Sequence, residues 1–266
     1  MNIQQYYRIA ANTALNGSLV AFLPMIIIVC FGLYFPVKLP MFLIVLPFCF
    51  YSFICYQNYL IQNDRSNEVN VIRKNTRKLS DANQLLITFL PAPSLRMLLF
   101  DEYGILIGEV RDKQFWWWRW FLPYFIDRLF PSWYGLYDGE NQLVCSYQVH
   151  DKMKNVKIFN SNQELIGLFN TNNKKKPSLI RNGTISSMIT GEKIQVKASS
   201  VYHHIQLHDE QGAIIGKLIK GWMPQEWGDL FRDANTPYIT FSPKINESEK
   251  MFIIGVLTEY FRYSDH

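Results

Sequence analysis

The sequence predicts a mainly β protein, in which an antiparallel β-barrel encloses a hydrophobic C-terminal α-helix and follows a two-helix transmembrane hairpin. Three observations predict this fold class. Two long uncharged runs stand near the N-terminus, four copies of a short hairpin pattern recur between residues 100 and 216, and the chain ends on a segment with no polar helix face. We therefore expect a membrane anchor followed by a single β domain.

The two uncharged runs cover residues 18–35 and 39–61, and Lys38 separates them. Each is long enough to cross a hydrocarbon core, which needs about 20 residues of helix. Residues 1–62 are therefore predicted as an N-terminal segment and a transmembrane helical hairpin. A cleaved signal peptide and a buried soluble helix pair are the alternatives. Against the signal peptide, Arg8 is the only basic residue in positions 1–16, and no small-residue cleavage site follows the first run.

Basic residues beside the spans set the predicted orientation. They cluster after the second run, whereas the connecting loop contains only Lys38. Because positively charged flanks stay on the inner side, we expect a multi-pass protein of the cell membrane whose two termini and β domain are cytoplasmic. Cysteine usage agrees with this placement: Cys145 is the only cysteine after the spans, so the β domain has no disulfide framework.

Residues 63–83 are predicted as a basic juxtamembrane linker. Its cations Arg73, Lys74, Arg77 and Lys78 would face a leaflet of negative surface potential, where each well-placed cation is worth about 1 kcal/mol. The positive-inside rule alone would place the same residues here. Contact with anionic phospholipid and a plain solvated connector are therefore both open.

A hairpin pattern recurs in the β domain, which is predicted at residues 84–266. Each copy has an apolar residue, an Asp/Asn/Gly turn that tolerates positive φ, and an aliphatic run closed by a small residue. Glycine closes three copies, which indicates a bend or a close backbone approach, as barrel corners require. The copies lie at 100–108, 137–145 and 159–167, with one that is a residue longer at 207–216. Further strands at 84–90, 144–149, 184–190, 193–198 and 238–241 bring the total to roughly ten to twelve.

The aromatic insertion at residues 113–133 lies between the first two copies, where a barrel needs only a short turn. Trp116, Trp117, Trp118 and Trp120 surround Arg119, and the next charge, Asp127, comes too soon for a membrane crossing. Tryptophan prefers the level of the headgroups, and arginine reaches phosphate from there. The insertion is therefore predicted as an interfacial helix, with packing inside the protein as the alternative.

The last element is predicted as a central helix at residues 250–263. Asn246 and Glu249 match a helix start with a capping box. No residue from Met251 to Leu257 is polar, so the start of this helix is expected to be buried on all sides. It reaches only about 20 Å, too short for a bilayer, which favours the inside of the barrel.

A meander of such hairpins followed by one hydrophobic helix resembles the tubby-like fold, shared by tubby C-terminal domains, phospholipid scramblases and LURP-one-related proteins. The resemblance covers residues 84–266. It implies a twelve-stranded barrel with the helix threaded through its centre, and family members include phosphoinositide binders and proteins associated with lipid scrambling. The chain matches neither the phosphoinositide pocket of the tubby proteins nor the acidic calcium-binding segment of scramblases. Its two spans indicate a separate, membrane-anchored branch.

Other candidate sites are weaker. His203, His204 and His208 lie close in sequence, but neighbours in a strand point to opposite faces and no Asp, Glu or Cys partner completes a metal site. Lys174, Lys175 and Lys176 form a run that either touches anionic headgroups or is simply solvated. The net charge of +5 is too modest and too scattered to favour nucleic acid.

We therefore expect a non-enzymatic membrane-anchored domain, without cofactor or metal, that binds anionic phospholipid or a membrane or cytoplasmic protein partner. A phospholipid scramblase-like transporter and a protein–protein adaptor are the alternatives. The transporter needs a polar groove along the spans, and neither span contains a charged residue to line one. The residues predicted at the lipid interface are Trp116, Trp117, Trp118, Arg119, Trp120, Arg73, Lys74, Arg77, Lys78, Lys174, Lys175 and Lys176.

Overall fold

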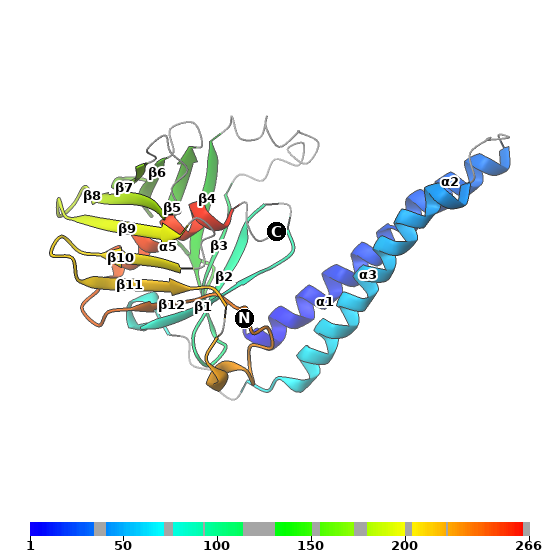
Figure 1. Ribbon diagram of the computed structural model, residues 1–266, viewed down its shortest axis with the longest axis horizontal. Helices are drawn as coiled ribbons and strands as arrows, with labels where there is room; N and C mark the ends of the chain where they lie inside the picture. The colour runs from blue at the N-terminus through cyan, green and yellow to red at the C-terminus, as the bar shows by residue number, and fades with distance from the viewer. Residues whose placement is uncertain are drawn as a thin grey trace. The chain divides into compact units, whose positions relative to one another are not determined.

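The computed structural model divides the chain into a helical unit, Asn2–Val71, and a barrel unit formed by Ile72–His266 with Met1. Figure 1 shows both units coloured from the N-terminus to the C-terminus. The structure describes residues 1–34, 41–71, 77–92, 94–113, 131–150, 155–172, 180–199, 204–221 and 223–262.

The helical unit consists of α1 (Ile3–Val20), α2 (Phe22–Tyr34) and α3 (Met41–Glu68). Asn2 caps α1 in a capping box with Gln5, so the first helix starts well before the predicted span. Two stretches, Ile3–Gly32 and Leu43–Glu68, are long and apolar enough to cross a membrane. The second of them continues past residue 61, where the span was predicted to end.

Small side chains form the contact between α1 and α3. Most of the buried positions along α1 and into α2 are small, and the Ser18 and Ser52 hydroxyls meet at 2.9 Å. Large apolar side chains such as Ile27 and Phe50 point outward and are more than 60% exposed. Small residues inside and large apolar ones outside are typical of helices that pack in lipid. The buried residues are Ile3, Tyr7, Ala10, Ala11, Ser18, Ala21 and Met25.

The barrel unit is a closed antiparallel β-barrel of twelve strands, as predicted. Each strand pairs with its neighbours in sequence, and β1 pairs with β12 to close the barrel. The strands are β1 (Gln84–Phe89), β2 (Arg96–Phe100), β3 (Leu106–Asp112), β4 (Ser132–Asp138), β5 (Leu143–His150), β6 (Asn155–Asn160), β7 (Leu165–Asn172), β8 (Ile180–Ser187), β9 (Lys193–Ser199), β10 (His204–His208), β11 (Ile214–Ile219) and β12 (Tyr238–Phe241).

The C-terminal helix α5 (Glu247–Phe261) begins with the expected capping box, in which Asn246 and Glu249 exchange hydrogen bonds. Its apolar side chains from Phe252 to Phe261 are buried in one hydrophobic cluster with the inward-facing side chains of the strands. Glycine allows this close packing. A Cβ at Gly255 would lie 2.9 Å from the Tyr147 ring, and one at Gly167 would lie 2.9 Å from Phe252.

The four predicted hairpin copies share one turn geometry. In each, the side-chain oxygen of an Asp or Asn accepts backbone N–H groups of the turn at 2.7–3.0 Å, two for each Asp and one for Asn160. The residue three positions later has a positive φ, and a β-bulge precedes the turn. The accepting residues are Asp101, Asp138, Asn160 and Asp209, and the positive-φ residues are Gly104, Asn141, Gln163 and Gly212.

The fourth copy is not longer than the others, so its predicted start at Leu207 is wrong. Its bulge lies between Leu207 and His208, so His208 takes the place that Phe100 and Tyr137 have in earlier copies. The copy therefore runs from His208 to Gly216 with the common spacing. The predicted start was chosen by the apolar residue, whereas the turn geometry is set by Asp209.

The positive φ of 65° at Gln163 strains a side chain that has a Cβ. We expect Gln163→Gly to raise the free energy of unfolding by about 0.5–1 kcal/mol. Conversely, Gly212→Ala should lower it by about 1 kcal/mol, because a Cβ there meets open space and only the backbone is strained. Denaturant unfolding of the full chain in detergent measures both changes. Asn162→Gly, one position earlier, is the control, and an equal gain there would contradict the explanation.

Candidate functional site

Most of the predicted interface residues lie outside the part of the chain that the structure describes. The Trp116–Trp120 and Lys174–Lys176 segments lie outside the described residues, as do Arg73 and Lys74. The connections that contain the two segments leave from β3 and β7 and return at β4 and β8. In an antiparallel meander these strand ends share one end of the barrel, here called the loop end. Arg77 and Lys78 lie at the opposite end, here called the turn end, where the four Asx turns and the start of α5 are found.

Charge differs between these two ends. Three outward lysines lie nearer the loop end, whereas carboxylates outnumber cations at the turn end. Three acids of the β11–β12 connection, Glu226, Asp229 and Asp233, interrupt the basic character of the loop end. The three lysines are Lys157, Lys197 and Lys217; the turn-end cations are Arg77, Lys78, Lys193 and Lys244, and the turn-end carboxylates are Asp81, Asp101, Glu102, Asp138, Glu140, Glu164, Glu192, Asp209, Glu210, Glu247 and Glu249.

A cavity of about 410 Å³ opens at the turn end. Its volume falls in the range of about 300–1,000 Å³ that holds small ligands. One part of the lining is apolar, and the charged part brings together two cations and three carboxylates. The apolar residues are Leu79, Leu99, Ile107, Leu136 and Val144, and the charged residues are Arg77, Lys78, Asp138, Glu140 and Glu247. The arrangement suits an amphiphilic ligand.

Lys250 fixes the wall of the cavity that carries the two cations. Its ammonium donates to the carbonyl oxygens of Leu79, Ser80 and Ala82 at 3.1, 2.6 and 2.8 Å. The side chain is buried, and this desolvation lowers the pKa of Lys250 while Asp81 and Glu247 oppose the shift. The 3₁₀ helix η1 (Leu79–Asp81) is thereby held against the first turn of α5.

The cations on this wall differ in their partners. Arg77 contacts Glu102 at 3.3 Å, and its guanidinium lies 5.0 Å from the Tyr103 ring centroid. Within the described part of the chain, the side chains of Lys78, Glu140 and Glu247 make no hydrogen bond or ion pair. Three charged groups at this cavity are therefore available to a ligand.

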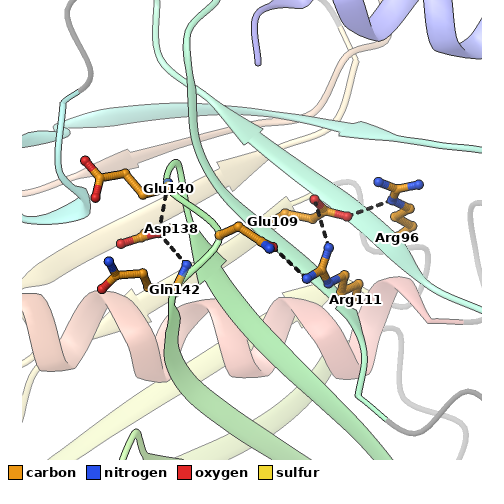
Figure 2. A network of polar contacts seen from close by, with 7 residues as sticks. Arg96, Glu109, Arg111, Asp138, Glu140 and Gln142 are labelled. Carbon is orange, nitrogen blue, oxygen red and sulfur yellow. Dashed lines mark hydrogen bonds and ion pairs between the residues drawn. The ribbon is translucent and has the colours of Figure 1, made fainter.

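An outer cluster on β2 and β3 holds the facing turn. Arg96 contacts Glu109 at 2.7 Å, and Arg111 lies 3.9 Å from the same carboxylate. Arg111 also donates to Asn141 at 2.6 Å, which ties the cluster to the β4–β5 turn. Figure 2 shows that Asp138 and Glu140 stand apart from the arginines, since the only contacts drawn for them are those within the turn. No sequence pattern indicates this cluster, because Arg96 and Glu109 lie 13 positions apart and Arg111 and Asn141 lie 30 positions apart.

Cys145, His204 and His208 belong to residue types that can react or bind metal, and their surroundings are as follows. The thiol of Cys145 is buried against the Tyr147 hydroxyl, and burial raises its pKa to about 12, so it stays protonated at neutral pH. His204 has its pKa lowered by desolvation and by Lys217, and a ring nitrogen of His208 lies 3.2 Å from the Gly212 carbonyl oxygen. His203 is outside the described residues. Among those described, no three His, Cys, Asp or Glu side chains converge as metal ligands.

Comparisons with known proteins give no family for this chain. No protein-family model matches it, and no curated protein matches it significantly. Its function therefore has to be inferred from the geometry of its own residues.

We expect Lys250→Met to lower the free energy of unfolding by about 2–4 kcal/mol, because three carbonyl oxygens, two of them in buried hydrogen bonds, lose a charged donor. Chemical denaturation of the full chain in detergent provides the measurement. Lys244→Met changes an exposed lysine near the same helix and should have little effect. Equal stability of the Lys250 variant and the wild type would show that the ammonium does not hold η1.

Asp101 generates a pH prediction, since burial raises the pKa of its carboxyl although the N–H groups of Ile105 and Tyr103 oppose the shift. Because this pKa is higher in the folded state than in the unfolded state, the free energy of unfolding of the protein falls as pH rises through the window above about 3.9. Asp101→Asn keeps the turn, as Asn160 does naturally, and removes the buried charge. The variant should be more stable than the wild type at pH 7.

This gain should vanish near pH 3, where Asp101 is neutral in both states. Thermal unfolding from pH 3 to pH 7 measures the difference. The same change at the less buried Asp209 is the control. A gain that is constant over the whole pH range would exclude the buried carboxylate as its cause.

Proposed function

We propose that this chain is a non-enzymatic, membrane-anchored protein of the tubby-like type, whose barrel lies at the cytoplasmic face and binds anionic lipid or a membrane partner. The observation that carries the proposal is the helical unit. Its two apolar stretches meet through small residues such as Ser18 and Ser52 and turn large apolar side chains outward. Water would solvate that surface poorly, whereas lipid chains cover it.

In this proposal α5 is the hydrophobic helix that the barrel encloses. Support comes from the burial of its apolar side chains among those of the strands. Tyr147 of β5 also donates to the carbonyl oxygen of Met251 at 2.9 Å, and Gly255 lies against the Tyr147 ring. These contacts join the helix to the barrel wall and give the resemblance to the tubby-like fold its physical basis.

The loop end is the proposed site of bilayer contact. Lys157, Lys197 and Lys217 lie toward it, and the connections with the tryptophan and lysine runs start there. Cations near an anionic leaflet are attracted by about 1 kcal/mol each, and tryptophan adds interfacial anchoring. The protein–protein adaptor and the scramblase-like transporter are the outcomes that the experiment separates.

The test uses the full chain reconstituted in nanodiscs that contain brominated phospholipid, which quenches nearby tryptophan. We expect strong quenching that increases with anionic lipid content. It should be largely lost when Trp116, Trp117, Trp118 and Trp120 are replaced by phenylalanine. The control replaces Trp133 and Trp227 and should leave most of the quenching in place.

Three further outcomes separate the alternatives. Alkaline extraction of native membranes should leave the chain in the pellet, and release into the supernatant would overturn the anchor. Quenching that does not depend on the four tryptophans would favour the adaptor. Transfer of labelled lipid between leaflets at a rate above that of empty vesicles would favour the transporter.

A further inference from the structure

The cavity at the turn end combines features that no part of the proposed function uses. It has an apolar part, charges of both signs that make no hydrogen bond or ion pair within the described residues, and walls held by hydrogen bonds. We propose that it binds the head of a zwitterionic phospholipid, an amphiphile that carries a phosphate and an ammonium next to an apolar chain.

The apolar part of the cavity would take the glycerol and the start of the chain. Leu99 and Leu136 reach it from neighbouring parts of the barrel wall, and almost all of their surface is already removed from water. Gly108 and Gly139 also line the cavity, and a Cβ on either would approach a backbone oxygen at 3.1 Å, so the backbone packs closely at this wall. A volume of about 410 Å³ accommodates a headgroup and the first part of a chain, rather than a whole phospholipid.

The charges select a zwitterion. Lys78 and Arg77 precede η1 on one wall, while Glu140 and Glu247 come from the β4–β5 turn and from α5. Asp138 adds a third carboxylate, and the Arg77 charge is shared with Glu102. A purely anionic ligand would meet three carboxylates, and a simple amine would meet the two cations. A ligand with both charges satisfies both walls, which is how electrostatic complementarity produces specificity.

Both walls are held in place before any ligand arrives. Lys250 binds the carbonyls of η1, and Arg111 binds Asn141 in the opposite turn. The Asp138 side chain accepts the N–H groups of Glu140 and Gln142 at 2.9 and 2.8 Å, which fixes the turn itself. A site whose walls need no ordering loses less entropy on binding.

This inference goes beyond the proposed function, because the cavity lies at the end of the barrel opposite the proposed bilayer contact. Its binding chemistry is independent of the anchor and of the loop end. The test therefore uses soluble ligands with the full chain in nanodiscs, and empty nanodiscs give the blank. The probes are dihexanoyl-phosphatidylethanolamine, dihexanoyl-phosphatidylglycerol, and glycerophosphoethanolamine, which has no chains.

Isothermal titration calorimetry should give a dissociation constant for the dihexanoyl ethanolamine lipid about tenfold lower than for the glycerol lipid. This ratio corresponds to a difference of about 1.4 kcal/mol in binding free energy. The chainless head should bind at least tenfold more weakly than the dihexanoyl form, because it leaves the apolar part empty. Equal binding of the ethanolamine and glycerol lipids, or binding of neither, would overturn the proposal.

Variants of exposed residues assign the charges. Glu140→Gln with Glu247→Gln should weaken binding of the ethanolamine lipid about tenfold and leave binding of the glycerol lipid unchanged or make it tighter. Lys78→Gln should weaken binding of both lipids. The matched control, Glu164→Gln with Glu226→Gln, removes two carboxylates away from the cavity and should change neither lipid. An effect of the control pair equal to that of the cavity pair would show general surface electrostatics and would contradict the site.

A failure here is distinguishable from a failure of the proposed function. A chain that resists alkaline extraction and shows tryptophan quenching, but does not distinguish the two dihexanoyl lipids, loses only the cavity assignment. A chain that is extracted from membranes but still prefers the ethanolamine lipid keeps the cavity and loses the anchor.

Discussion

The packing of α5 against the inward side chains of the strands is the constraint on which the rest of the barrel unit depends. Close contact between the helix and the strands explains glycine at 167 and 255, where a Cβ would meet the Phe252 and Tyr147 rings, and Tyr147 donates a hydrogen bond to the carbonyl oxygen of Met251. The first turn of the same helix supplies Lys250, which holds η1, and Glu247, which lines the cavity. Core and candidate site thus share one element.

Local chemistry made the hairpins predictable. An Asp or Asn followed three residues later by a left-handed residue closes a turn within a few positions, so Asp101, Asp138, Asn160 and Asp209 could be located from sequence alone. The start of α5 was equally local, in its capping box. The bulge before each turn depends on pairing with the neighbouring strand, which a single sequence does not display, and the fourth copy was misaligned for that reason.

The candidate site could not be predicted in this way. Lys250 and Ser80 are separated by 170 positions, and Arg111 and Asn141 by 30, so no window of sequence contains both partners. The sequence grouped Arg77 and Lys78 with the tryptophan and lysine runs as a common lipid interface because all of them carry basic or aromatic character. The topology instead places the two cations beside three carboxylates at the turn end. Charge composition predicted the residues of interest, and the pairing of strands determined their neighbours.

The pairing of β1 with β12 has a consequence for how other proteins can approach the barrel. A sheet with a free edge offers a row of unpaired N–H and C=O groups, to which an extended peptide or another copy can add as one more strand. Closure uses up both edges, with Gln84 opposite Thr240 and Leu86 opposite Tyr238. The twelve described strands therefore leave no free sheet edge for main-chain augmentation, so a partner of this barrel is recognised through side chains.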